Sequence, residues 1–86
     1  MQTFIFTCTI ADRTDFDLDL ADAIYAAGAD DSSVGSRDGV VTVDFDREAE
    51  TLDQAVRTAI DDLAKAGLRV SVVRIDANSL KAIEAA

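Results

Sequence analysis

The residues in this chain that could do chemistry are mostly carboxylates. Its 86 residues include 17 acids and 8 bases but no histidine, and the formal net charge is -9. Acids alternate with other residues in two places, at 15–19 and at 44–50. Such alternation occurs in calcium loops and in acid–base sites, so metal binding and acid–base catalysis are the chemistries to weigh.

The stretch from Asp15 to Asp19 alternates like the start of a calcium loop. That loop needs glycine at its sixth position and a bidentate glutamate at its twelfth, where this chain has Leu20 and Ala26. The same D-x-D pattern occurs in aspartyl phosphotransferases, but there it follows a buried strand, and here it falls at an expected helix start. We therefore expect no metal site.

The pair Asp44 and Asp46 has the spacing of same-face neighbours on a strand, about 6 to 7 Å. Acid–base work by such a pair requires surroundings that separate the two pKa values, and the sequence indicates none. The absence of histidine also removes the commonest general base and metal ligand. We expect a protein that is not an enzyme and has no catalytic residue and no cofactor.

A hairpin is the strongest structural signal. Asp38-Gly39 precedes the β-branched run 40–46, and an Asp-Gly pair suits a tight turn because both residues tolerate positive φ. It predicts an edge strand over 31–37 and a central strand over 40–46. Apolar alternation predicts further strands over 3–10 and 68–75. The expected inward side chains are Phe4, Phe6, Cys8, Ile10, Val41, Val43, Phe45, Leu68, Val70 and Val72.

Apolar residues at helical spacing predict two helices between the strands. The first begins near Phe16 and ends at Ala27, with Gly28 as its cap. The second follows a capping box formed by Thr51 and Gln54 and closes at Gly67. Its apolar stripe is Leu52, Ala55, Val56, Ala59, Ile60, Leu63 and Ala66.

The resulting order is β-α-β-β-α-β, and a shift of 39 residues maps Phe6 onto Phe45 and Gly28 onto Gly67. This predicts a single α+β domain over residues 1–86: a ferredoxin-like sandwich over 3–76 and a short C-terminal helix over 78–86. Its four-stranded antiparallel sheet is expected in the order 4-1-3-2, with two helices on one face. The other face is expected to be open to a partner, but its central outward positions lack the aromatics of an RNA-binding sheet.

The acidity is concentrated in residues 1–50, which hold twelve acids against three bases. Such a surface repels nucleic acid and anionic membranes and favours a basic protein partner, one that itself handles nucleic acid. We expect a cytoplasmic protein because the chain has no membrane-span pattern and no leader pattern. A monomer or a weak homodimer is expected. The candidate partner-binding residues are Asp15, Asp17, Asp19, Asp22, Asp30, Asp31, Asp44, Asp46, Glu48 and Glu50.

The runs 33–35, 38–40, 43–49, 67–70 and 73–75 resemble the N-terminal domain of small bacterial antitoxin-like regulators. In that family the domain precedes a helix-turn-helix. The likeness spans residues 3–76, and the chain ends about ten residues after the last strand, so no recognition helix is expected. The resemblance implies a partner-sensing domain without the DNA-binding half.

As a class, the chain also resembles small acidic phage inhibitors, such as anti-CRISPR proteins and other nucleic-acid mimics. The leading hypothesis is a non-enzymatic inhibitor whose acids occupy a basic groove meant for phosphates. The alternative is a regulatory or antitoxin-type module that dimerises or senses a small ligand through its open sheet face.

Overall fold

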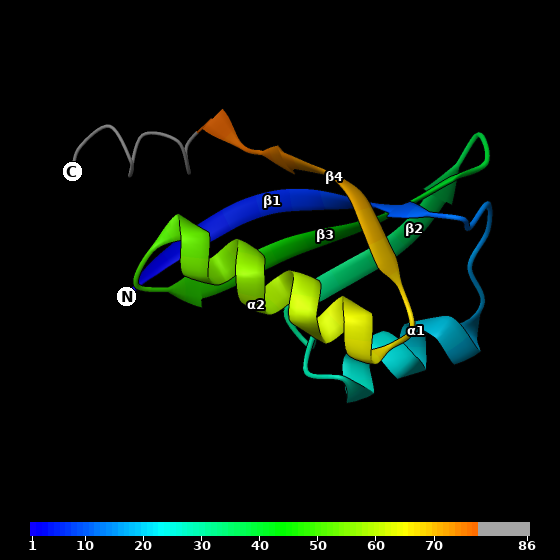
Figure 1. Ribbon diagram of the computed structural model, residues 1–86, viewed down its shortest axis with the longest axis horizontal. Coiled ribbons are helices and arrows are strands. Elements are labelled where there is room, and N and C mark those ends of the chain that lie inside the picture. Colours follow the sequence, from blue (N-terminus) through cyan, green and yellow to red (C-terminus); the bar gives the residue numbers. More distant parts are fainter. Residues whose placement is uncertain (78–86) are drawn as a thin grey trace.

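The computed structural model describes residues 1–77. They form a four-stranded antiparallel sheet with two helices on one face (Figure 1). The elements are β1 (Gln2–Ala11), α1 (Leu18–Ala26), β2 (Ser32–Arg37), β3 (Val40–Ala49), α2 (Leu52–Lys65) and β4 (Arg69–Ile75). The strand order is β2-β3-β1-β4, which reads β4-β1-β3-β2 from the opposite edge. The α+β class is confirmed, and the helix expected over 78–86 lies outside the described residues.

The predicted hairpin is confirmed. Asp38 and Gly39 have φ values of 53° and 77°, and they connect the paired residues Arg37 and Val40. Two positive φ values are the geometry of the type I′ turn that suits the twist of a hairpin. Strand β3 continues to Ala49, beyond the predicted end at residue 46, because its last residues pair with the start of β1.

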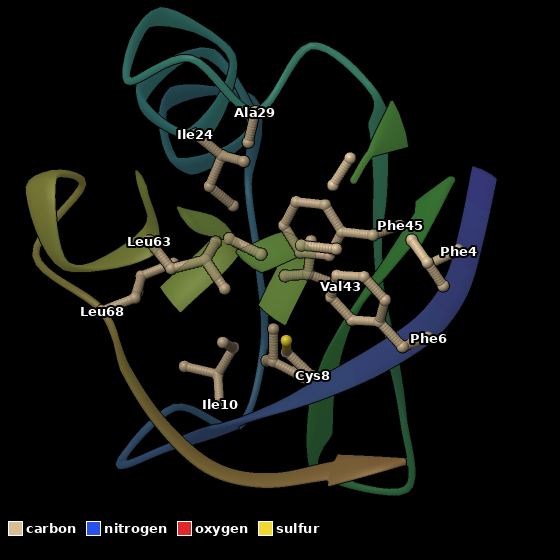
Figure 2. Packing of buried hydrophobic residues seen from close by; sticks show 14 of the residues in the cluster. Phe4, Phe6, Cys8, Ile10, Ile24, Ala29, Val43, Phe45, Leu63 and Leu68 are labelled. Carbon is tan, nitrogen blue, oxygen red and sulfur yellow. The ribbon is translucent and has the colours of Figure 1, made fainter. Parts of the chain in front are cut away.

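The core lies between the helices and the inward face of the sheet (Figure 2). The rings of Phe6 on β1 and Phe45 on β3 stack with their centroids 5.2 Å apart and an interplanar angle of 14°. Cys8 is fully buried among these side chains. Nine of the ten expected inward residues pack in or against the core, and the exception is Val72.

Helix α2 forms as its sequence predicts. Thr51 is the N-cap, and its Oγ1 accepts a hydrogen bond from the Gln54 backbone N–H at 3.1 Å. The Gln54 side chain in turn accepts from the Glu50 backbone N–H at 3.0 Å. Leu52, Ala55, Ala59 and Leu63 are buried, whereas Ile60 is 36% exposed. Neither helix in the described part of the chain is long and apolar enough to cross a membrane.

Helix α1 begins later than predicted. Asp17 is its N-cap and accepts a hydrogen bond from the Leu20 backbone N–H at 2.9 Å, so the first helical residue is Leu18. A carboxylate in this position satisfies one of the unpaired N–H groups of the first turn, which fixes where the helix starts. Phe16 therefore precedes the helix and is 36% exposed, and only Leu20 and Ile24 of α1 are buried.

The predicted facing of β4 is wrong beyond Val70. The register with β1 shifts between Thr9 and Ile10: Ile10 faces Val70, but Thr9 faces Val72. A bulge adds one residue to one strand and so exchanges the two faces for every residue that follows. Val72 is consequently 54% exposed on the open face, and Val73 and Ile75 pack against the core.

Candidate protein-binding surface

Three acids form a row along β3 on the open face of the sheet. Burial alternates along this strand, so Asp44, Asp46 and Glu48 point away from the helices and are exposed. They lie in register with Thr7, Ile5 and Thr3 of β1. Same-face neighbours on a strand are about 6 to 7 Å apart, so the row presents carboxylates at a regular interval. The structure confirms none of the roles expected of these acids, but it does place them side by side.

A hollow on this face collects four of the ten candidate residues. Asp30 and Asp31 come from the segment ahead of β2, and Asp44 and Asp46 come from β3. We call this the sheet-face hollow; its other lining residues are Ile5, Thr7, Ser32, Ser33 and Phe45. The Thr7 hydroxyl donates to Asp44 Oδ1 at 2.6 Å, which holds that carboxylate over the sheet. Acids that are 14 residues apart in the sequence therefore share one surface site.

Arg47 is the residue of this region that the sequence analysis missed. Its side chain lies on the helix-facing side of β3, and the residue is only 8% exposed. Its guanidinium donates to both Asp31 carboxylate oxygens, at 2.8 and 2.9 Å, and to Asp62 Oδ2 at 2.9 Å. It also donates to Thr58 Oγ1 at 3.1 Å and lies 5.0 Å from the centre of the Phe45 ring. We call Arg47, Asp31, Asp62 and Thr58 the Arg47 cluster.

The Arg47 cluster ties the segment ahead of β2 to helix α2 through a cation on β3. The two hydrogen bonds from Arg47 to Asp31, more than the one to Asp62, raise the guanidinium pKa above its ordinary value, against the opposing effect of burial. The strand alternation was the available signal, since residue 47 shares the parity of Val43 and Phe45. Asp31 is thus engaged inside the protein and supports the hollow, although 28% of its side chain remains exposed.

A second hollow lies beside the first. Its lining residues are Gly28, Asp31, Asp46, Arg47, Glu48, Thr58 and Asp62. The two hollows share Asp31 and Asp46. Asp46 therefore stands between them, and the acidic surface extends from the open face toward the Arg47 cluster.

The candidate acids around α1 divide into two groups. Asp15 Oδ1 accepts from the Ser36 hydroxyl of β2 at 3.1 Å, and Asp22 lines a groove between α1 and β2. We call it the α1–β2 groove; its lining residues are Ala21, Asp22, Ile24, Tyr25, Ala29, Ser32 and Val34. Asp17 is the N-cap of α1, Asp19 lies in its first turn, and Glu50 precedes α2. These three acids line neither of the two hollows nor the groove.

The single cysteine of the chain, Cys8, is the other side chain to consider for chemistry. Burial raises the pKa of the Cys8 thiol from 9.0 to about 11, an effect that the nearby charge of Arg47 only partly offsets. A neutral, buried thiol is a poor nucleophile and behaves as a small hydrophobic side chain. Within residues 1–77, no three side chains of the metal-binding types are grouped so that they could hold an ion.

Comparisons with known proteins identify no related protein. The chain matches no protein-family model, and no curated protein or solved structure is significantly similar to it.

Proposed function

We propose that this protein is a non-enzymatic inhibitor that binds a basic, nucleic-acid-handling protein through its acidic surface. The single observation that carries the proposal is the sheet-face hollow, where Asp30, Asp31, Asp44 and Asp46 converge from two segments. Glu48 extends the same row along β3. A fixed set of carboxylates on a rigid sheet presents negative charge to a groove that otherwise takes phosphates.

The charge distribution supports this proposal. Arg47, the basic residue closest in sequence to the row, faces inward and is paired with Asp31 and Asp62. The exposed carboxylates of β3 are consequently not neutralised by it. With Asp31 already paired, Asp30 and the acids of the β3 row steer a basic protein toward this face and repel nucleic acid. Inhibition of a nucleic-acid-handling enzyme in phage counter-defence, as by anti-CRISPR proteins, is the setting that we propose.

The arrangement of the helices and strands also supports this proposal. The β-α-β-β-α-β order and the two helices on one face support a ferredoxin-like sandwich, in which the second face of the sheet is left for a partner. This leaves the row on β3 accessible.

A charge-reversal pair tests the proposed function. The partner would first be identified by co-purification from cells that express the protein beside the products of its neighbouring genes. Asp46→Lys, in both hollows, is expected to weaken binding to that partner by more than tenfold. Asp61→Lys on α2 makes the same change in net charge away from both hollows, and it is expected to weaken binding only slightly. Equal losses for the two variants would contradict the assigned surface.

A second candidate function has its own supporting observation. The open face also exposes apolar side chains, with Ile5 43%, Val40 44% and Val72 54% exposed. These residues favour a regulatory or antitoxin-type module that dimerises or senses a small ligand through the sheet. Sedimentation over a range of concentrations separates the two functions: a dimer that Val72→Asp disrupts supports the module, whereas a persistent monomer supports the inhibitor.

A further inference from the structure

Strand β2 offers a free edge next to the acidic surface. It lies at one edge of the sheet and pairs only with β3. The Asp46 N–H donates to the Asp31 carbonyl at 3.1 Å, which makes these two residues a hydrogen-bonded pair. Hydrogen-bonded pairs alternate along an antiparallel ladder, so Ser33, Gly35 and Arg37 also bond to β3. Ser32, Val34 and Ser36 therefore direct their backbone N–H and C=O groups outward.

No other segment of residues 1–77 reaches these outward groups through its backbone. The Ser32 hydroxyl donates to the Ala29 carbonyl, and the Ser36 hydroxyl donates to Asp15, so side chains brace the strand from the helix side. An edge with outward N–H and C=O groups is a template for one more strand. The geometry of β2 thus provides a backbone recognition site.

Acids flank this edge on both sides. On the open face lie Asp30 and Asp44 of the sheet-face hollow. On the helix face lies the α1–β2 groove, which combines Asp22 with the apolar side chains of Ile24 and Val34. Side chains of an added strand alternate between the two faces, so one set would meet carboxylates and the other would enter the groove.

We propose that the partner binds by adding an extended segment, in which lysine or arginine alternates with apolar residues, to the free edge of β2. This inference rests on the proposed function and specifies how that surface is used. The basic side chains lie over the sheet-face hollow, and the apolar ones enter the α1–β2 groove. A second copy of this chain is a poor occupant, because two β2 edges would bring the same acids together.

The test uses the full chain and two short synthetic peptides of equal charge. In one peptide lysine alternates with valine, and in the other it alternates with proline, which cannot form a paired strand. Amide hydrogen exchange is followed by NMR. The lysine–valine peptide is expected to slow exchange at Val34 and Ser36, which point outward. Exchange at Ser33 and Gly35, which bond to β3, should change little.

A proline substitution supplies an independent readout. Ser36→Pro removes an outward N–H, and the preceding Gly35 tolerates the restriction that proline imposes. Ser36→Ala is the matched control, since both variants lose the hydroxyl that donates to Asp15. Ser36→Pro is expected to weaken binding of the lysine–valine peptide by about tenfold relative to Ser36→Ala. Thermal unfolding of both variants verifies that each still folds.

The outcomes separate this inference from the proposed function. Peptide binding without slower exchange at Val34 and Ser36, or with equal affinity for Ser36→Pro and Ser36→Ala, overturns strand addition and leaves the acidic inhibitor intact. Slower exchange at these amides in the peptide-free protein as its concentration rises shows that a second copy occupies the edge, which also overturns it. If the co-purified partner binds but the lysine–valine peptide does not, strand addition is wrong; if Asp46→Lys also leaves binding of that partner unchanged, both proposals are wrong.

Discussion

Among single residues, Arg47 is the one that fixes segments of the acidic surface in place. Its guanidinium is the common partner of Asp31 and Asp62, which come from different parts of the chain. Removing one partner of a buried ionic cluster leaves charges without compensation, which is far more costly than losing an exposed pair. Arg47 therefore organises the surface without being exposed on it.

Arg47→Ala is expected to lower the free energy of unfolding by about 3 kcal/mol, because two carboxylates then face each other without a cation. The control is Arg57→Ala. Arg57 pairs with Asp53 at 2.9 Å, but both side chains are about three-quarters exposed and the pair is screened by solvent, so the expected loss is much smaller than for Arg47→Ala. Urea unfolding followed by circular dichroism measures both. Similar losses for the two variants would mean that the Arg47 cluster contributes no more than a surface pair.

Cys8 gives a prediction about pH. Burial raises its pKa to about 11 in the folded protein from 9.0, so the folded state retains the thiol proton at a pH where the unfolded state has lost it. Stability is therefore unaffected by this group below about pH 9 and falls by about 1.4 kcal/mol per pH unit as the pH rises toward 11. The expected fall is measured as the difference between wild type and Cys8→Val in urea unfolding at each pH. A constant difference from pH 8 to 11 would show that Cys8 ionises as freely in the folded state as in the unfolded one.

At the scale of elements, the turn after α1 is coupled to the Arg47 cluster. Gly28 has φ of 111°, and a Cβ added there would lie 3.3 Å from Asp62 Oδ1. Gly67, after α2, has φ of 82° with nothing within 4 Å of the added Cβ. Glycine is therefore favoured at position 28 both by its positive φ and by the closeness of Asp62, and at position 67 by its positive φ alone.

Gly67→Ala is expected to cost about 1 kcal/mol through its backbone conformation, and Gly28→Ala is expected to cost more because it also displaces Asp62. Part of the excess reflects the less favourable φ at Gly28, so the comparison is repeated in an Asp62→Ala background. There the cost of Gly28→Ala should decrease, which thermal or urea unfolding would detect. An unchanged cost would show that Asp62 plays no part in the requirement for glycine.

The elements also show which structural features a sequence can predict. The Asp38-Gly39 turn and the Thr51 cap were predictable because their signals lie within a few residues of the structure they specify. The bulge in β4 was not, since it depends on pairing with β1, and Val72 and Val73 are equally apolar. The end of β3 likewise depends on pairing with Gln2, more than 40 residues away.

The same holds for the candidate protein-binding surface: its local features could be predicted, and its contacts between distant segments could not. The row Asp44, Asp46 and Glu48 could be identified from alternation alone. That Asp31 pairs with Arg47, and that Asp15 meets Ser36, depends on how separate segments pack. The sequence therefore indicated which residues are acidic and on which strand face they lie, but it did not indicate which of them share a surface.

At the scale of the whole molecule, charge is the dominant property. The described residues form a flat body, about 38 × 26 × 16 Å, with the core between two layers. One layer is a sheet whose outer face carries the sheet-face hollow and the β3 row. A net charge of -9 on so small a body favours association with a basic partner, and the attraction is expected to weaken as salt screens it.

If the proposed function is right, this surface competes with nucleic acid for a basic protein. The most direct measurement is displacement of a fluorescent oligonucleotide from the co-purified partner by the wild-type protein, at low and at high ionic strength. The proposed function predicts that the oligonucleotide is displaced and that the affinity of the protein for the partner falls steadily with added salt. An oligonucleotide that stays bound while the protein also binds, or an affinity that is unchanged by salt, would contradict it.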